Sequence, residues 1–200
     1  APASGRQVWT LIDMFPGRPG MTVIGENGGI VMRDGVEVSS HPVDTPTVRE
    51  VIRLVREATS GPDGIDGGLV MCGKQFAYVE RTDDRFVDGV MPYYHRTKRV
   101  DDQIAIIDGI EGGEIDDAIV KLAVYVIGPV QALAEATLAR FADTHQYAIS
   151  GANWADLQIR GVDKGSAVRD LQRFLGVDRS QTAVFGDAGN DLSMMSEGDL

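Results

Sequence analysis

The chain has 200 residues, which is enough for one large domain or two small ones with a substantial buried core. Apolar residues make up 43% and charged residues 24%, as in ordinary globular proteins, and no apolar run of about 20 residues predicts a membrane span. The formal net charge of −11 argues against a nucleic-acid partner, because phosphate binding needs a concentrated basic surface. The single cysteine, Cys72, excludes an internal disulfide and favours a reducing, cytoplasmic compartment.

The first 40 residues predict a helix, a strand and a hairpin. Apolar residues between Val8 and Phe15 recur at the spacing of an amphipathic helix, which Pro16-Gly17 ends. Thr22–Ile24 is a short apolar strand. The two apolar segments that follow flank Asp34-Gly35, a dipeptide suited to a tight hairpin turn.

The middle of the chain, residues 43–160, predicts a mixture of helices and strands. Thr45-Pro46 opens a helix with proline at its first position, and another helix starts at Pro129. Residues 86–94 are ambiguous, with helix favoured, and residues 109–117 predict an acidic loop. The expected strands, assigned mainly to an antiparallel sheet, cover residues 69–72, 76–80, 119–127, 147–150 and 156–160.

The last 40 residues predict a helix, a buried strand and a glycine-rich turn. The helix runs from Lys164 to Leu175 and ends at Gly176. Thr182–Phe185 is β-branched and apolar without polar alternation, which is typical of a strand buried on both faces of a parallel sheet. A turn rich in glycine and acidic residues follows and leads into another helix.

Two carboxylates in this turn predict a metal site. Asp187 lies one glycine beyond the expected strand, at the end where open α/β sheets bind ligands, and Asp191 returns from the first helical turn. Hard oxygen ligands suit Mg²⁺, and Mg²⁺ commonly acts on phosphate. In the alternative interpretation these acidic residues only cap a helix and satisfy backbone amides.

Lys164 is the second informative residue. A lysine at the start of a helix stands against the field of the helix dipole. An anion bound jointly by the lysine and the helix amides would explain that placement, whereas the alternative is a solvated lysine whose stem leaves the field.

Two more segments predict anion binding. Ser4-Gly5-Arg6 precedes the first helix, where a hydroxyl, backbone amides and a planar guanidinium make an anion site. An ordinary serine cap is the alternative. Asn27-Gly28 places a polar side chain and bare backbone after a strand, although a simple turn would use the same residues.

The order of these motifs resembles the haloacid dehalogenase superfamily. Near its start the chain has Ser-Gly-Arg and a helix, followed by Glu-Asn-Gly-Gly and a long insertion. After the insertion come Lys-Gly with a second helix and then Gly-Asp-x-x-Asn-Asp-x-x-Met. The pattern looks like the branch of Cof-type sugar phosphatases. The resemblance implies an α/β fold in which a Rossmann-like core, residues 1–42 and 161–200, carries an inserted α+β cap, residues 43–160.

The same resemblance implies hydrolysis of phosphate monoesters through an aspartyl-phosphate, with Mg²⁺ as cofactor. Asp187 would bind the metal, and Asp191 would support it or bind it through water. Lys164 would neutralise the transferring phosphoryl group and orient the nucleophile. The remaining implied contacts with phosphate or substrate come from Ser4, Gly5, Arg6, Asn27, Gly28 and Asn190.

One family motif is missing from the sequence. The family's Asp-x-Asp-Gly, which supplies the nucleophile and general acid, is expected a few dozen residues before Ser4, and so upstream of Ala1. The leading hypothesis is a Mg²⁺-dependent phosphatase of small phosphorylated metabolites, chiefly sugar phosphates. A non-catalytic relative that binds phosphorylated ligands or a protein partner is the alternative. The oligomeric state is not predicted.

Other conspicuous residues receive structural interpretations. The three histidines lie far apart in sequence without the spacing of zinc ligands. Trp154 is expected to cover the sheet rather than line a substrate pocket, and Asp116 and Asp117 are expected in a solvated loop.

Overall fold

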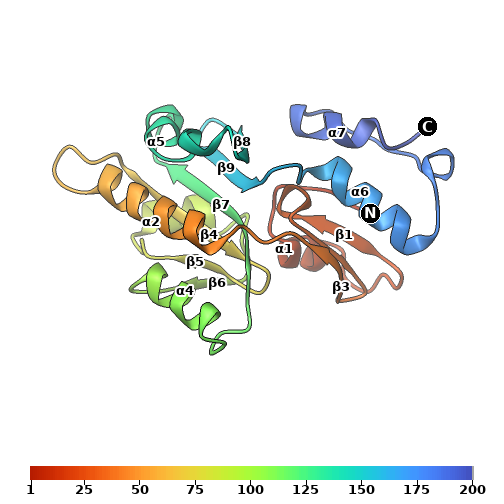
Figure 1. The fold of residues 1–200 in the computed structure, drawn as a ribbon, viewed down its shortest axis with the longest axis horizontal. Coiled ribbons are helices and arrows are strands. Elements are labelled where there is room, and N and C mark those ends of the chain that lie inside the picture. Colours follow the sequence, from red (N-terminus) through yellow and green to blue (C-terminus); the bar gives the residue numbers. More distant parts are fainter. Residues whose placement is uncertain (200) are drawn as a thin grey trace. The chain divides into compact units, whose positions relative to one another are not determined.

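The computed structural model describes residues 1–199, which form two compact units. The split unit joins Ala1–His41 to Gly161–Leu200, and the inserted unit is continuous over Pro42–Arg160 (Figure 1). The first boundary falls one residue before the one expected from the sequence, and the second falls between Arg160 and Gly161 in both cases. Among the described residues no helix combines the length and apolarity that crossing a membrane requires.

The first part of the split unit is a helix and a three-stranded antiparallel sheet. Its elements are α1 (Val8–Met14), β1 (Thr22–Gly25), the 3-10 turn η1 (Glu26–Gly28), β2 (Ile30–Arg33) and β3 (Val36–Ser40), with strand order β1-β2-β3. The predicted hairpin is confirmed. Asp34 and Gly35 both have positive φ, 51° and 79°, as the tight turns that join twisted strands require.

The second part of the split unit packs a long helix on this sheet. Its elements are α6 (Lys164–Leu175), η3 (Arg179–Gln181), η4 (Gly189–Asp191) and α7 (Leu192–Met195). The predicted bounds of α6 are confirmed, because the Asp163 side chain caps its start and Gly176, at φ 67°, ends it. Ala167 of this helix packs against Ile24 and Val31 of the sheet.

The buried strand predicted at Thr182–Phe185 is wrong. This segment has no regular secondary structure; Val184 is buried, but Phe185 is 85% exposed. A strand needs a neighbour to accept and donate its backbone hydrogen bonds, and none of the strands in residues 1–199 pairs with this segment. Apolar composition alone therefore did not decide its conformation.

The inserted unit is built on a six-stranded sheet with the order β6-β5-β4-β7-β9-β8. All neighbouring pairs are antiparallel except β5 and β6, so the antiparallel prediction holds for all but one edge. The strands are β4 (Gly67–Gly73), β5 (Ala77–Val79), β6 (Thr97–Arg99), β7 (Ile119–Val126), β8 (His145–Ile149) and β9 (Trp154–Ile159).

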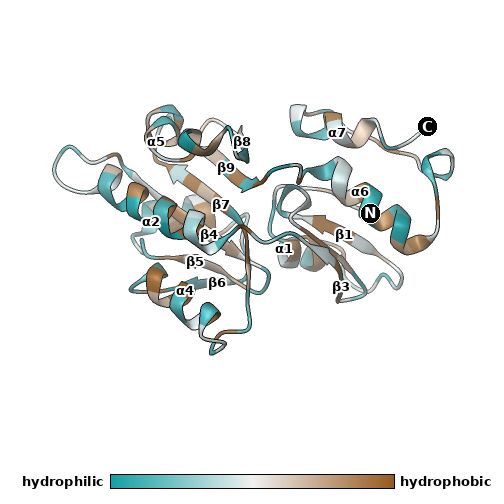
Figure 2. Ribbon diagram, viewed as in Figure 1, coloured by the Kyte–Doolittle hydropathy of each residue, from teal (hydrophilic) through white to brown (hydrophobic). Residues whose placement is uncertain are grey.

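The inserted unit's helices are α2 (Thr45–Thr59), α3 (Asp84–Val90), α4 (Gln103–Glu111) and α5 (Gln131–Ala136), followed by the 3-10 turn η2 (Leu138–Phe141). Side chains from α2, α4 and α5 pack with Met71 and Leu122, whereas α3 packs with Val70 and Ala123. Successive residues of a strand therefore pack in different core clusters, because their side chains point alternately to the two faces of the sheet. Figure 2 shows apolar and polar bands alternating along the amphipathic α2.

Three predictions about these helices need correction. The start of α2 is capped by Asp44, so Pro46 occupies the second helical position rather than the first. The helix expected from Pro129 is divided by Thr137, whose ψ of −84° is not helical. The expected acidic loop at 109–117 starts inside α4, because the last three residues of that helix belong to it.

Asp117 is not in a solvated loop as predicted, although its neighbour Asp116 is exposed. Its carboxylate accepts hydrogen bonds from the Tyr78 hydroxyl (2.8 Å) and from the backbone amides of Gln75 (3.1 Å) and Ala118 (2.7 Å). Burial and the neighbouring carboxylate raise the pKa of Tyr78. Asp117 therefore fixes the turn between β4 and β5 to the start of β7.

Trp154 packs among tyrosines of the inserted unit. Its ring centroid lies 4.8 Å from that of Tyr125, 5.4 Å from that of Tyr93 and 6.0 Å from that of Tyr94. No group of three or more histidine, cysteine, aspartate or glutamate residues in residues 1–199 is arranged to hold a metal ion.

Candidate active site

The candidate site residues predicted from the sequence all lie in the split unit, where direct contacts connect them. Residues 2–6 run beside β1. The amide of Ile24 donates to Pro2 O (2.9 Å), and that of Ser4 donates to Ile24 O (3.0 Å). The amide of Asn27 then donates to Ser4 O (3.0 Å), so the chain after β1 returns to the Ser4 segment.

Ser4 shapes its own loop rather than capping α1. Its hydroxyl accepts a hydrogen bond from the backbone amide of Arg6 (3.2 Å), and α1 starts only at Val8. The cap interpretation is therefore wrong. The Arg6 carbonyl accepts from the amide of Glu26 (2.9 Å), which fixes the far end of the loop.

The segment after β1 holds three successive residues with positive φ. These angles are 50° for Glu26, 52° for Asn27 and 102° for Gly28, a conformation that side-chain-bearing residues rarely adopt. A Cβ at Gly28 would overlap the carbonyl of Asp163, so only glycine fits there. The turn therefore brings Asn27 and Gly28 against the start of α6.

Lys164 and Asp191 form a buried ion pair in this region. The Lys164 Nζ lies 2.6 Å from Asp191 Oδ1, and the two residues are 5% and 7% exposed. The hydrogen bond from Lys164 holds the pKa of Asp191 below its ordinary value, with help from the amides of Ala188 and Asp187 and against the effect of burial. Asp191 is therefore ionised at neutral pH.

Asp191 also shapes the turn that carries Asp187. Its second oxygen, Oδ2, accepts from the amides of Asp187 (3.2 Å) and Ala188 (3.1 Å). A Cβ at Gly186 would collide with the Asp191 side chain, which explains glycine there. The Asp187 side chain remains exposed at the tip of this turn.

An amide pair connects this turn to the turn after β1. Asn190 Nδ2 donates to Asn27 Oδ1 at 3.1 Å. The same Asn27 oxygen lies against Gly5, where an added Cβ would be 3.0 Å away. The structure thus brings together all nine residues that the sequence predicts for the site, although it does not test their roles.

Two residues that sequence reasoning did not single out organise the start of α6. Asp163 accepts from the amide of Ser166 (2.8 Å), and Ser193 Oγ accepts from the amide of Gly165 (3.2 Å). The role of Asp163 could have been predicted from the Asp-x-x-Ser pattern of a helix cap. The role of Ser193 could not, because it depends on a contact between α7 and α6. The amides of Gly165 and Ser166 are therefore already hydrogen-bonded within the protein. An anion at the start of this helix would be bound by Lys164 without help from these two amides.

The donor set at the turn fits Mg²⁺ in one way. Asp191 already accepts three hydrogen bonds, whereas Asp187 offers an exposed carboxylate. Mg²⁺ keeps several waters and is often held by one or two carboxylates together with substrate phosphate. Asp187 could therefore bind Mg²⁺ directly, and Asp191 could hold Asp187 in position for it.

Sequence comparison assigns the chain to a family. The family described as haloacid dehalogenase-like hydrolase matches residues 2–200, and the chain belongs to it. An Escherichia coli (strain K12) protein, 5-amino-6-(5-phospho-D-ribitylamino)uracil phosphatase YbjI, is 32% identical over 200 residues, covering 98% of this chain and 68% of that protein. The family predicted from the sequence is confirmed, and the Cof-type branch is supported.

Solved structures share the fold. A protein from Eubacterium rectale superposes with a TM-score of 0.78 at 21% identity, over 98% of this chain and 70% of its own. A haloacid dehalogenase-like hydrolase from Bacillus subtilis gives a TM-score of 0.78 at 15% identity, over 98% of this chain and 73% of its own. The predicted α/β fold class is confirmed.

Proposed function

We propose that this chain carries the phosphate-handling and metal-handling residues of a Mg²⁺-dependent phosphatase acting on small phosphorylated metabolites, chiefly phosphorylated sugars and sugar alcohols. One observation carries the proposal: the buried Lys164–Asp191 pair holds the turn on which the exposed carboxylate of Asp187 lies. A cation, an anchored carboxylate and a free carboxylate are the groups that phosphoryl transfer needs for charge compensation.

The curated relative supports the substrate class. Its name describes a phosphate ester of a ribityl chain, and it shares 32% of its aligned residues with this chain. The single cysteine fits a reducing cytoplasm, and we retain this compartment as part of the proposal.

Mg²⁺ held by Asp187 would supply a Lewis acid that shields the charge of the phosphoryl group. Asp191 fixes the turn through the amides of Asp187 and Ala188, so the Asp187 carboxylate is preorganised. Lys164 contributes a positive charge that Asp191 holds at the start of α6, where it compensates the charge of the phosphoryl oxygens.

The turns around Asn27 would hold the phosphoryl group and the adjoining substrate. Ser4 and the amide of Gly5 suit the phosphoryl oxygens, and Arg6 offers a planar donor. Asn190 and Asn27 already bond to each other (3.1 Å), so a substrate oxygen can take the place of one partner. Gly28 leaves the backbone bare beside the start of α6.

The nucleophile is the part of the proposed mechanism that residues 1–200 do not supply. We place it, with its general acid, in an Asp-x-Asp-Gly motif preceding Ala1. The first aspartate attacks phosphorus to give an aspartyl-phosphate while the phosphate-ester bond breaks and the general acid protonates the departing alcohol oxygen. Water then hydrolyses the aspartyl-phosphate and releases inorganic phosphate. Sequencing the region encoded upstream of Ala1 tests this part on its own.

The activity is tested on the protein that includes those preceding residues. Release of phosphate from a panel of sugar, polyol and nucleoside monophosphates is measured with and without Mg²⁺. The proposal expects hydrolysis of sugar or polyol phosphates that EDTA abolishes and Mg²⁺ restores. Saturable binding of these esters without turnover would instead favour the non-catalytic relative.

A further inference from the structure

The six-stranded sheet of the inserted unit ends in two edges of different character, β6 and β8 (Figure 1). Among residues 1–199 each of these two strands pairs with a neighbour on one side only. An edge strand presents N–H and C=O groups to which another chain can add, and proteins commonly protect such edges with short strands and charged side chains.

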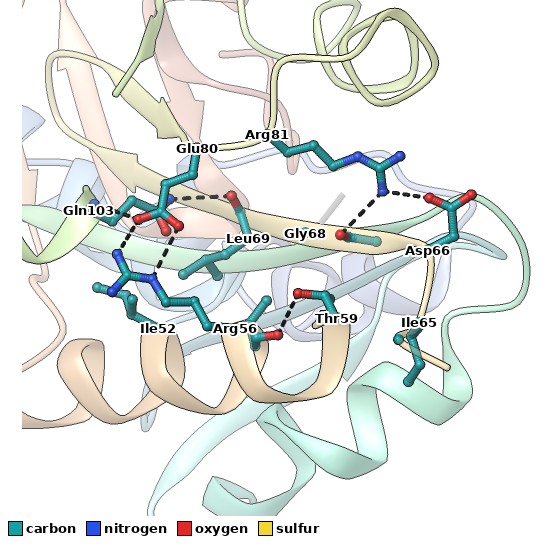
Figure 3. Close-up of a pocket in the computed structure, with 13 residues that line it drawn as sticks. Ile52, Arg56, Thr59, Ile65, Asp66, Gly68, Leu69, Glu80, Arg81 and Gln103 are labelled. Carbon is teal, nitrogen blue, oxygen red and sulfur yellow. Dashed lines mark hydrogen bonds and ion pairs between the residues drawn. The ribbon is translucent and has the colours of Figure 1, made fainter. Parts of the chain in front are cut away.

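The β6 edge has this protection. It has only three residues, Thr97–Arg99, and its lysine and its arginine are both exposed. A second copy paired antiparallel about Lys98 would place two lysines directly opposite each other, which is destabilising. Charges also lie beside this edge, because Arg56 binds Glu80, the residue that follows β5 (Figure 3). A second copy of the chain therefore does not fit here.

The β8 edge lacks this protection. Its five residues, His145–Ile149, include no lysine, arginine, aspartate or glutamate, and Ile149 is 45% exposed. His145 Nε2 lies 3.2 Å from Asp44 Oδ2, so the ring of the one histidine in the strand already faces a carboxylate of its own chain. An edge strand without charges of its own is a template on which another strand can pair.

Half of the backbone groups of β8 point away from the sheet. In an antiparallel pair, alternate residues direct both their N–H and their C=O groups to the same neighbouring strand. Ser150 N donates to Trp154 O at 3.0 Å, in register with the pairing of β8 and β9, so the backbone groups of Gln146 and Ala148 face β9. The backbone groups that point to the open side belong to the remaining residues of the strand, His145, Tyr147 and Ile149.

The β8 strand is complementary to its own copy. Antiparallel pairing about Tyr147 would place this residue opposite Tyr147 of the partner subunit, and His145 opposite Ile149 of the partner subunit. All the outward N–H and C=O groups would then have partners. On the other face of the strand, Gln146 would lie opposite Ala148 of the partner subunit. No pair combines like charges, and the central pair is aromatic, which favours association across strands.

We propose that β8 is an interface at which two copies of this chain join their sheets antiparallel, across a two-fold axis at Tyr147. The contact is small, so the association is weak and depends on concentration. The net charge of −11 makes the copies repel each other, and a higher salt concentration therefore strengthens the association. This interface is independent of the proposed phosphatase activity, because it contains none of the candidate active-site residues.

Sedimentation equilibrium of the 200-residue chain over a concentration series tests for this dimer. The measured mass rises from 21.6 kDa toward twice that value, and added salt moves the rise to lower concentrations. Ile149→Pro weakens the association about tenfold or more, because it removes an outward N–H group that β9 does not use. Edge strands tolerate proline at such a position. Ile149→Ala is the matched control, since it shortens the same side chain but keeps the N–H group and therefore retains the association.

A pair of double variants tests the register without changing the backbone, because Gln146 and Ala148 are both exposed. Gln146→Lys with Ala148→Lys places lysines opposite each other and weakens the association about tenfold or more, although it lowers the net negative charge. Gln146→Lys with Ala148→Glu places opposite charges there instead and keeps the affinity within about threefold of wild type.

The proposal is overturned if the mass stays at 21.6 kDa at every concentration and salt level. It is also overturned if Ile149→Pro associates as well as Ile149→Ala, or if the two double variants associate equally.

Discussion

The ammonium of Lys164 lies 2.6 Å from the carboxylate of Asp191, and both side chains are at most 10% exposed. The pair joins the first residue of α6 to the turn that ends in α7, 27 positions later in the chain. Because Asp191 also accepts two backbone amides of that turn, a single buried carboxylate determines where the exposed Asp187 lies.

Asp191→Asn should destabilise the split unit strongly. The change leaves Lys164 buried without its counter-charge, which typically costs about 3–5 kcal/mol. Urea unfolding followed by Trp9 fluorescence in a Trp154→Phe background measures it, because Trp9 packs in the split unit. In the matched control, Lys164→Met combined with Asp191→Leu, no charge is left unpaired, and the loss should be smaller. An equal loss would show that packing, not charge, is responsible.

The stabilisation from Asp191 should depend on pH. Its pKa is lowered in the folded state, first by the hydrogen bond from Lys164, so the folded protein binds fewer protons here than the unfolded chain. The contribution is complete above the ordinary carboxyl pKa and is lost as pH falls through the lowered value. The difference in unfolding free energy between wild type and Asp191→Asn should therefore shrink from pH 7 to pH 3. A difference that stays constant would contradict the assignment.

Gly28→Ala should be much more disruptive than Gly35→Ala. Both glycines have positive φ, 102° and 79°, but only at Gly28 would a Cβ meet the Asp163 carbonyl, whereas Gly35 has open space. We expect about 1 kcal/mol for Gly35→Ala and about 3 kcal/mol or more for Gly28→Ala. Thermal unfolding of the two variants gives the comparison, and similar losses would mean that Gly28 is needed only for its backbone angle.

Phe185→Ser should leave the stability of the 200-residue chain nearly unchanged, within about 0.5 kcal/mol, because Phe185 is 85% exposed. Val184→Ala, at the adjacent buried position, should cost more. Urea unfolding of both variants separates the observed irregular segment from the strand expected from the sequence. A large loss for Phe185→Ser would favour the strand.

Local patterns predicted the parts of the fold that local contacts determine. The bounds of α6 followed from its cap residue and from Gly176, and the hairpin followed from Asp34-Gly35. Asp187 and Asp191 are four residues apart, so the turn that joins them could also be read from the sequence.

Features that depend on distant neighbours could not be predicted in this way. The edge strand β6 consists of the polar residues Thr97–Arg99 and exists only because β5 pairs with it. The sequence around Asp117 is typical of a loop, and only the folded structure brings the Tyr78 hydroxyl and the amide of Gln75 within hydrogen-bonding distance of it. Thr182–Phe185 has the composition of a buried strand, but pairing partners decide whether a strand forms.

We propose that Asp187, held by the Lys164–Asp191 pair, binds a divalent cation. Mn²⁺ replaces Mg²⁺ at carboxylate sites and broadens the amide signals of nearby residues, so titrating it into the ¹⁵N-labelled chain tests the claim directly. We predict selective broadening of the amides from Gly186 to Asn190, lost in Asp187→Asn and retained in the exposed-carboxylate control Asp63→Asn. Equal broadening of these amides in wild type and Asp187→Asn would show that Asp187 is not a metal ligand.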